Sequence, residues 1–150
     1  QYADLHSNTL AQWAVAEFVR RGWLDEHLAL LRREYPLRRR AMLSTLDEHV
    51  PRGMHWNEPA GGFYLWCRLE EGLRSKELLV EAARRGVAFV AGEAFHVDGG
   101  GQDALRLNFA HHDEETTQEG VRRLGEALTT LLSGRRERRA VRQEAAQPIV

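Results

Sequence analysis

Apolar residues at helical spacing mark the first predicted element of the chain. They are Leu10, Trp13, Ala14 and Phe18. Residues three and four positions apart lie on one face of a helix, so this spacing predicts an amphipathic helix. Ser7 or Asn8 can cap its start by accepting a hydrogen bond from a backbone N–H, and Gly22 can end it in the left-handed conformation.

A second and longer helix is predicted between Asp25 and Val50. Its apolar positions are Leu28, Leu31, Tyr35, Met42, Leu43 and Leu46, and Pro51 and Gly53 follow its end. Pro36 lies inside it. Because proline has no backbone N–H to donate, we expect a kink at this position.

From Met54 onward, short apolar runs separated by glycine replace the helical spacing. The runs cover residues 63–67, 87–90 and 105–110. Short apolar runs bounded by turn residues are typical of strands. Between the first two we predict a helix that Ser75 caps and Gly86 ends. A last helix is predicted after Asp113, with apolar positions Val121, Leu124, Leu128 and Leu131.

This order of elements predicts an α/β fold, with a small sheet that has helices packed on one face and two helices before it. We expect three regions: a helical segment over 1–52, a small α/β domain over 53–132, and a polar tail over 133–150. The tail has little to bury, so we predict a solvated, disordered segment. The alternative is a basic docking arm.

The charge balance and the hydropathy of the chain indicate which kinds of binding partner to expect. The 150 residues hold 21 Lys and Arg against 22 Asp and Glu, a formal net charge of -1. This balance argues against a broad surface for nucleic acid or an anionic membrane. No apolar run approaches the roughly 18 residues of a membrane span, so we expect a cytoplasmic protein. The first residue, Gln1, suggests a fragment or a processed product.

The cysteine and histidine pattern predicts no disulfide and no metal site. Cys67 is the only cysteine, and the seven histidines include no HExxH spacing. His111 and His112 are adjacent in sequence, and adjacent side chains diverge on a strand or helix.

Arg106 is the strongest candidate for binding chemistry. In residues 105–109, alternation with period two places Leu105, Leu107 and Phe109 on one face, and Arg106 and Asn108 on the other. The apolar face belongs to the core, so Arg106 is displayed on the opposite face. A guanidinium can bind a carboxylate there through two parallel hydrogen bonds. A solvated arginine or a structural ion pair fits the same pattern.

Two glycine-containing loops lie before the strands that carry these residues. Residues 92–101 begin with Gly92 and end with three glycines, as expected of a loop at the edge of a pocket or of a flexible connection. Residues 59–62 form a second turn. Neither has the spacing of a dinucleotide or P-loop motif.

Three motifs in order resemble the small domain of class I and II aminotransferases, which depend on pyridoxal phosphate. They are residues 59–66, PAGGFYLW, residues 86–95, GVAFVAGEAF, and residues 105–110, LRLNFA. The helix segment 119–124 and the stretch 4–8 agree as well, so the resemblance covers 1 to about 132. It is strongest to the 2-aminoadipate or multisubstrate branch, which shares its pattern with MocR-type regulators. Ala91 is a departure, since the family usually has proline there.

The resemblance implies a function for the intact protein and roles for single residues. It implies transfer of an amino group between an amino acid and a 2-oxo acid by a homodimer that binds pyridoxal phosphate. Arg106 would bind the substrate α-carboxylate, beside Asn108. The cofactor lysine would lie upstream, on a missing large domain from which the helical segment 1–52 links, because Lys76, the only lysine, does not match its position. The fragment alone would be inactive.

Two further implications stay open at this point. His6 and Ser7 precede a helix, whose N-terminal N–H groups favour an anion such as the cofactor phosphate, although plain helix capping explains them too. The alternative function is the effector-binding domain of a MocR-type transcriptional regulator, with DNA bound by a region outside this chain. A structural domain with a decayed pocket is a third possibility.

Overall fold

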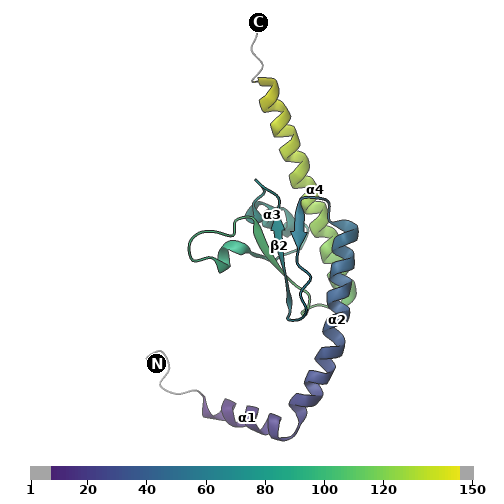
Figure 1. Ribbon diagram of the computed structural model, residues 1–150, viewed down its shortest axis with the longest axis vertical. Helices are drawn as coiled ribbons and strands as arrows, with labels where there is room; N and C mark the ends of the chain where they lie inside the picture. Colours follow the sequence, from purple (N-terminus) through teal and green to yellow (C-terminus); the bar gives the residue numbers. More distant parts are fainter. Residues whose placement is uncertain (1–7, 146–150) are drawn as a thin grey trace. The chain divides into compact units, whose positions relative to one another are not determined.

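The computed structural model describes residues 8–145, and side chains as far as Arg138. Along the chain the order is α1, α2, β1, β2, α3, β3, a short 3-10 helix η1, β4 and α4 (Figure 1). The chain divides into two compact units, residues 1–37 and residues 38–150. No helix in the described part of the chain is long and apolar enough to cross a membrane.

The first unit holds α1, Thr9–Arg20, and the beginning of α2, Trp23–His49. Asn8 caps α1, because its Oδ1 accepts a hydrogen bond from Ala11 N at 3.1 Å. Gly22 has a φ of 76°, the left-handed conformation predicted for it. No residue of α1 is buried, and Trp13 is 66% exposed.

The boundary between the two units falls inside α2 rather than at residue 52. The helix continues through Pro36, and four residues beyond it are buried: Ala41, Met42, Thr45 and Leu46. No residue of α2 before Leu37 is buried. The second half of α2 therefore belongs to the second unit because it contributes to that unit's core.

A four-stranded antiparallel sheet in the order β1-β2-β4-β3 forms the centre of the second unit. The strands are Met54–Trp56, Tyr64–Leu69, Val90–Ala91 and Ala104–Asn108 for β1, β2, β3 and β4. The strand predicted over 87–90 is shifted, since only Val90 and Ala91 pair with β4. β1 is too short to show an alternation in the sequence and depends on its pairing with β2.

Helices cover one face of this sheet, as predicted. Alternate strand residues point into the core and are buried: Leu65, Cys67 and Leu69 on β2, and Leu105 and Leu107 on β4. Helix α3, Ser75–Ala83, buries Leu78 and Ala82, and α4, Glu114–Ala145, buries Val121, Leu124, Ala127 and Leu128. Apart from Ala104, which is buried at the start of β4, the intervening residues on the other face of β2 and β4 are more exposed.

The predicted helix caps are partly right. Asp113 caps α4, with its Oδ1 accepting from Thr116 N at 2.8 Å, and Gly86 has a φ of 76° after α3. The prediction that Ser75 caps α3 is wrong. Ser75 is the first helical residue, it is fully buried, and its hydroxyl has no hydrogen-bond partner. Arg74 holds the cap position without a side-chain hydrogen bond.

The last helix is longer than predicted. We expected a polar tail without regular structure from residue 133, but α4 continues to Ala145. The segment 133–145 is rich in Arg, Glu, Gln and Ala, which are good helix formers, so a helix can continue there without an apolar face. Residues 146–150 lie outside the described residues.

Candidate functional site

The candidate site is the face of the sheet that the helices leave open. On this face Trp66 of β2 stands directly opposite Arg106 of β4, and Tyr64 stands opposite Asn108. Val90 of β3 is the neighbour of Arg106 on its other side. Arg106 is therefore on the face away from the core, as the alternation predicts, and its neighbours in the sheet are apolar or aromatic.

The Arg106 guanidinium lies against two aromatic rings. Its Cζ is 3.9 Å from the centre of the Tyr64 ring and 4.6 Å from the centre of the Phe95 ring. Both distances are within the range of a cation–π interaction. The Phe95 ring in turn meets Trp66 edge-on, with ring centres 5.5 Å apart. Two aromatic rings from two elements thus contact the cation, and a third ring packs against one of them.

No acidic group neutralises Arg106 within the described part of the chain. The other half-buried arginines, Arg38, Arg39, Arg85, Arg122, Arg123 and Arg135, each donate a hydrogen bond to a carboxylate or a carbonyl. Among residues 8–138, Arg106 is the half-buried arginine with neither a hydrogen bond nor an ion pair. The structural ion pair that the sequence left open is absent there, and its N–H donors are unused.

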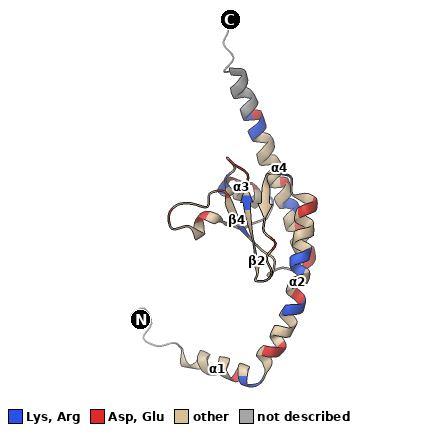
Figure 2. Cartoon of the chain, in the orientation of Figure 1, with Lys and Arg blue, Asp and Glu red and all other residues tan. Residues whose placement is uncertain are grey.

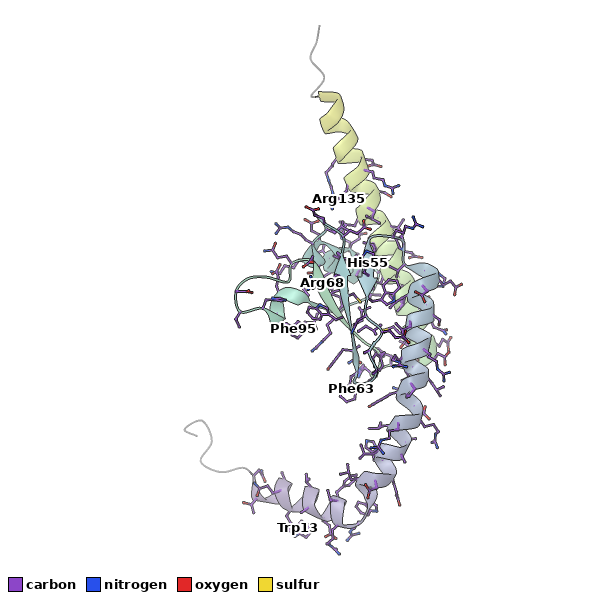
Figure 3. All side chains as sticks on the ribbon, in the orientation of Figure 1. Trp13, His55, Phe63, Arg68, Phe95 and Arg135 are labelled. Atoms are coloured by element: carbon purple, nitrogen blue, oxygen red, sulfur yellow. The ribbon has the colours of Figure 1, made fainter. Side chains whose placement is uncertain are left out.

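The loop that follows β3 brings Phe95 to the site. It begins with η1, Gly92–Phe95, and Phe95 is labelled in Figure 3. A Cβ on Gly92 would lie 2.6 Å from the Gly101 carbonyl oxygen, so the two ends of the loop meet at van der Waals distance. Glu93 forms an ion pair with Lys76 of α3. These contacts make the segment a folded loop at the edge of the site rather than an unsupported connection.

Asn108 is placed less favourably than Arg106 for binding. Its Oδ1 accepts a hydrogen bond from Ala110 N at 2.7 Å, which closes a local turn after β4. The side-chain NH2 has no hydrogen bond within residues 8–138. Asn108 therefore offers a donor near the site, while its oxygen is occupied.

Three further residues were singled out by the sequence: His6, Ser7 and Lys76. His6 and Ser7 lie outside the described residues, so their proposed contact with a phosphate stays a prediction. Lys76 is 67% exposed and ion-paired with Glu93 at the start of α3. The described residues do not fit a pyridoxal phosphate site, because the only lysine of the chain is committed to this surface ion pair.

Cys67 is also unsuited to chemistry. It lies on the core side of β2 with no exposed surface, and burial raises the pKa of its thiol to about 12. A thiol that remains protonated is a poor nucleophile and a poor metal ligand. Within residues 8–138, no group of three or more His, Cys, Asp or Glu side chains is arranged to hold a metal ion.

A separate groove lies at the start of α4 and is not lined by Arg106. This groove of about 590 Å³ runs along the start of α4 and is lined by His111, His112, Glu119 and Arg123, among others. Glu119 and Arg123 are paired with each other, and the two histidine rings meet edge-on at 4.6 Å. The charges of Glu119 and Arg123 are therefore already partnered, whereas Arg106 on the open face has no ion-pair partner among residues 8–138, and the open face remains the better candidate. Figure 2 shows the two signs of charge interspersed along α2 and α4.

The aromatic residues of the site were only partly visible in the sequence. Alternation places Tyr64 and Trp66 on one face of their strand, but the face that they share with Arg106 depends on the β2–β4 register. Phe95 comes from a loop, and no periodicity predicts where a loop side chain points.

Comparison with solved structures gives the same fold at high identity. The chain superposes with a TM-score of 0.83 on the α-aminoadipate aminotransferase LysN of Thermus thermophilus, crystallised with N-(5'-phosphopyridoxyl)-L-leucine. The two are 43% identical, over 89% of this chain and 34% of that one.

Curated proteins of similar sequence include aminotransferases as well. A 2-aminoadipate transaminase of Thermus thermophilus is 43% identical over 89% of this chain and 33% of its own length. An aromatic-amino-acid aminotransferase of Thermococcus litoralis is 40% identical over 85% and 31%. An uncharacterized helix-turn-helix transcriptional regulator of Bacillus subtilis is more distant, at 29% identity over 27% of its length. The chain spans about a third of the length of the aminotransferases that it matches. Residues 3–124 match the model of the aminotransferase class I and II family, and the chain belongs to this family.

Proposed function

We propose that this chain is the C-terminal part of a pyridoxal-phosphate-dependent aminotransferase, and that Arg106 binds the α-carboxylate of its amino acid and 2-oxo acid substrates. One observation carries the proposal: Arg106 is half-buried on the open face of the sheet, with unused N–H donors and no acidic partner among residues 8–138. A guanidinium in this state offers a planar pair of donors that matches a carboxylate.

The cofactor would be held by the rest of the protein. When bound, pyridoxal phosphate supplies the carbonyl group that accepts the amino group and the ring that withdraws electrons from the reacting carbon. The task of Arg106 is orientation. It fixes one end of the substrate, so that the α-carbon is presented in a constant position. We also propose that the intact protein is a homodimer and that it is cytoplasmic.

The relatives indicate which substrates to test. They include a 2-aminoadipate transaminase and an aromatic-amino-acid aminotransferase, so both kinds of amino acid are candidates. Both carry the α-carboxylate that Arg106 would bind. The aromatic amino acid phenylalanine has a convenient partner for a test, because phenethylamine is the same molecule without the carboxylate.

Replacing Arg106 by lysine in the intact, cofactor-loaded protein tests the assignment. Lysine keeps the charge but loses the planar fork, so transition-state stabilisation should fall by about 1.5–3 kcal/mol. This corresponds to a loss of roughly ten- to a hundredfold in kcat/KM for phenylalanine. Phenethylamine should be affected little, and the free energy of unfolding should change by less than about 1 kcal/mol.

Arg68 provides a matched control on the same face. It lies two positions from Trp66 on β2 and is ion-paired with Asp103 at 3.6 Å. Arg68→Lys should leave kcat/KM for both substrates unchanged. If Arg106→Lys lowers turnover of phenylalanine and phenethylamine equally, or merely unfolds the protein, Arg106 is a structural residue and the assignment is wrong.

The effector-binding domain of a regulator is the second candidate, because helix-turn-helix regulators are among the matched proteins. The region upstream of this chain separates the two functions. A DNA-binding helix-turn-helix there, with amino acid binding but no turnover, would favour the regulator.

A further inference from the structure

The orientation of the Arg106 guanidinium needs an explanation. An arginine side chain has several rotatable bonds, and it is normally held in one orientation by hydrogen bonds or an ion pair. Arg106 has neither within residues 8–138. Its guanidinium instead lies over two aromatic rings, with Cζ 3.9 Å from the ring centre of Tyr64 and 4.6 Å from that of Phe95.

We propose that Tyr64 and Phe95 are positioning residues, which hold the Arg106 guanidinium in the orientation that receives a carboxylate. This inference rests on the proposed function of Arg106. The rings attract the cation through their electron-rich faces, so they stabilise it without occupying an N–H donor. A carboxylate acting as partner in the resting protein would hold the cation as well, but it would compete with the substrate.

Both rings are themselves held in place. Tyr64 lies on β2, and its position relative to Arg106 is set by the backbone pairing of Trp66 with Arg106. Phe95 ends η1 and meets Trp66 edge-on at 5.5 Å. The loop that carries it is fixed by the Glu93 ion pair with Lys76 and by the close approach of Gly92 and Gly101.

The rings also exclude water from part of the cation. Arginine is weakly hydrated on the faces of its guanidinium, and an aromatic ring can cover such a face at little cost. With less water nearby, the attraction between the remaining N–H groups and a carboxylate becomes stronger. A substrate carboxylate then meets a donor pair that is already oriented, and this lowers the ordering cost of binding.

Phe95→Leu tests the proposal, because leucine keeps an apolar side chain and removes the aromatic face. The variant is made in the intact protein with cofactor bound. Binding of 3-phenylpropanoate, which has the carboxylate but no amino group, is measured by calorimetry beside its uncharged amide. We expect Phe95→Leu to weaken binding of the carboxylate by about five- to thirtyfold. Binding of the amide should stay within about twofold.

Two conservative variants and one control separate positioning from structure. Phe95→Tyr and Tyr64→Phe retain the rings and should bind the carboxylate as the parent does, whereas Tyr64→Leu should behave as Phe95→Leu does. If Phe95→Leu does not fold, the comparison of Tyr64→Phe with Tyr64→Leu tests the positioning role instead. Val97→Ala changes a fully exposed residue of the same loop and should have no effect on either ligand.

Turnover adds a readout that a purely structural role would not move. The KM for phenylalanine should rise in Phe95→Leu, while kcat/KM for phenethylamine stays constant. On an Arg106→Lys background, Phe95→Leu should have almost no further effect on the preference for carboxylate over amide, because the two residues act as one unit.

The two proposals fail in different ways. If Arg106→Lys lowers the preference for carboxylate and the leucine variants do not, the positioning role is wrong and the proposed function stands. Equal loss of carboxylate and amide binding in the leucine variants would also overturn the positioning role. If Arg106→Lys leaves the preference unchanged, the assignment of Arg106 itself is wrong.

Discussion

Two glycines of α4 should respond in opposite ways to the same substitution. Gly120 and Gly125 both lie inside this helix. A Cβ on Gly120 would have no heavy atom within 4 Å. A Cβ on Gly125 would lie 2.3 Å from the backbone oxygen of His49 and 3.0 Å from its carbonyl carbon. Gly125 is therefore the point where α4 passes the end of α2 at backbone distance.

The magnitude follows from two terms. Alanine in place of glycine inside a helix gains about 1 kcal/mol in propensity, and both variants receive this gain. In Gly125→Ala, α4 and the end of α2 must also separate by about 1 Å to reach ordinary contact, and overpacking of this kind costs about 1–3 kcal/mol. Because the neighbouring atoms belong to the backbone, no rotamer change can relieve the clash.

Thermal unfolding followed by circular dichroism measures the difference. For a chain of this length, 1 kcal/mol corresponds to about 3 °C in Tm. Gly120→Ala should raise the Tm by about 3 °C, and Gly125→Ala should lie about 3–10 °C below it. Urea midpoints should shift in the same directions with an unchanged m value. Equal increases in Tm for both variants would refute the close approach of α4 to His49.

Two further predictions concern titratable groups. Hydrogen bonds from Arg122 and then Arg123 lower the pKa of Glu119 from 4.5 to about 2. A lowered pKa in the folded state stabilises the fold above pH 4.5, and this contribution is lost as the pH falls toward 2. Glu119→Gln should therefore lower the Tm at neutral pH and reduce its fall with acid, and parallel curves for variant and parent would contradict this. Because burial raises the pKa of Cys67 to about 12, iodoacetamide should label it in guanidinium but hardly at all in the folded chain. Equal labelling rates would show that β2 opens readily.

The local sequence determined most of the helices, the alternating strands and the identity of the main site residue. Alternation along residues 105–109 is a property of one strand alone. It places Arg106 on the face away from the buried Leu105 and Leu107, whatever elements lie next to the strand. In the same way, Asp113 and Gly86 act through the backbone groups next to them, so capping could be predicted from short stretches.

Only the tertiary structure decided what surrounds Arg106 and which elements share a core. The antiparallel register brings Trp66 and Tyr64 to its side, and the loop whose ends approach closely at Gly92 and Gly101 brings Phe95 to it. These contacts join residues distant in sequence, and no local periodicity encodes a distance between them. The same reason explains the Ser75 prediction: its position before an apolar run is typical of a cap, but the packing of α3 buries it as the first helical residue.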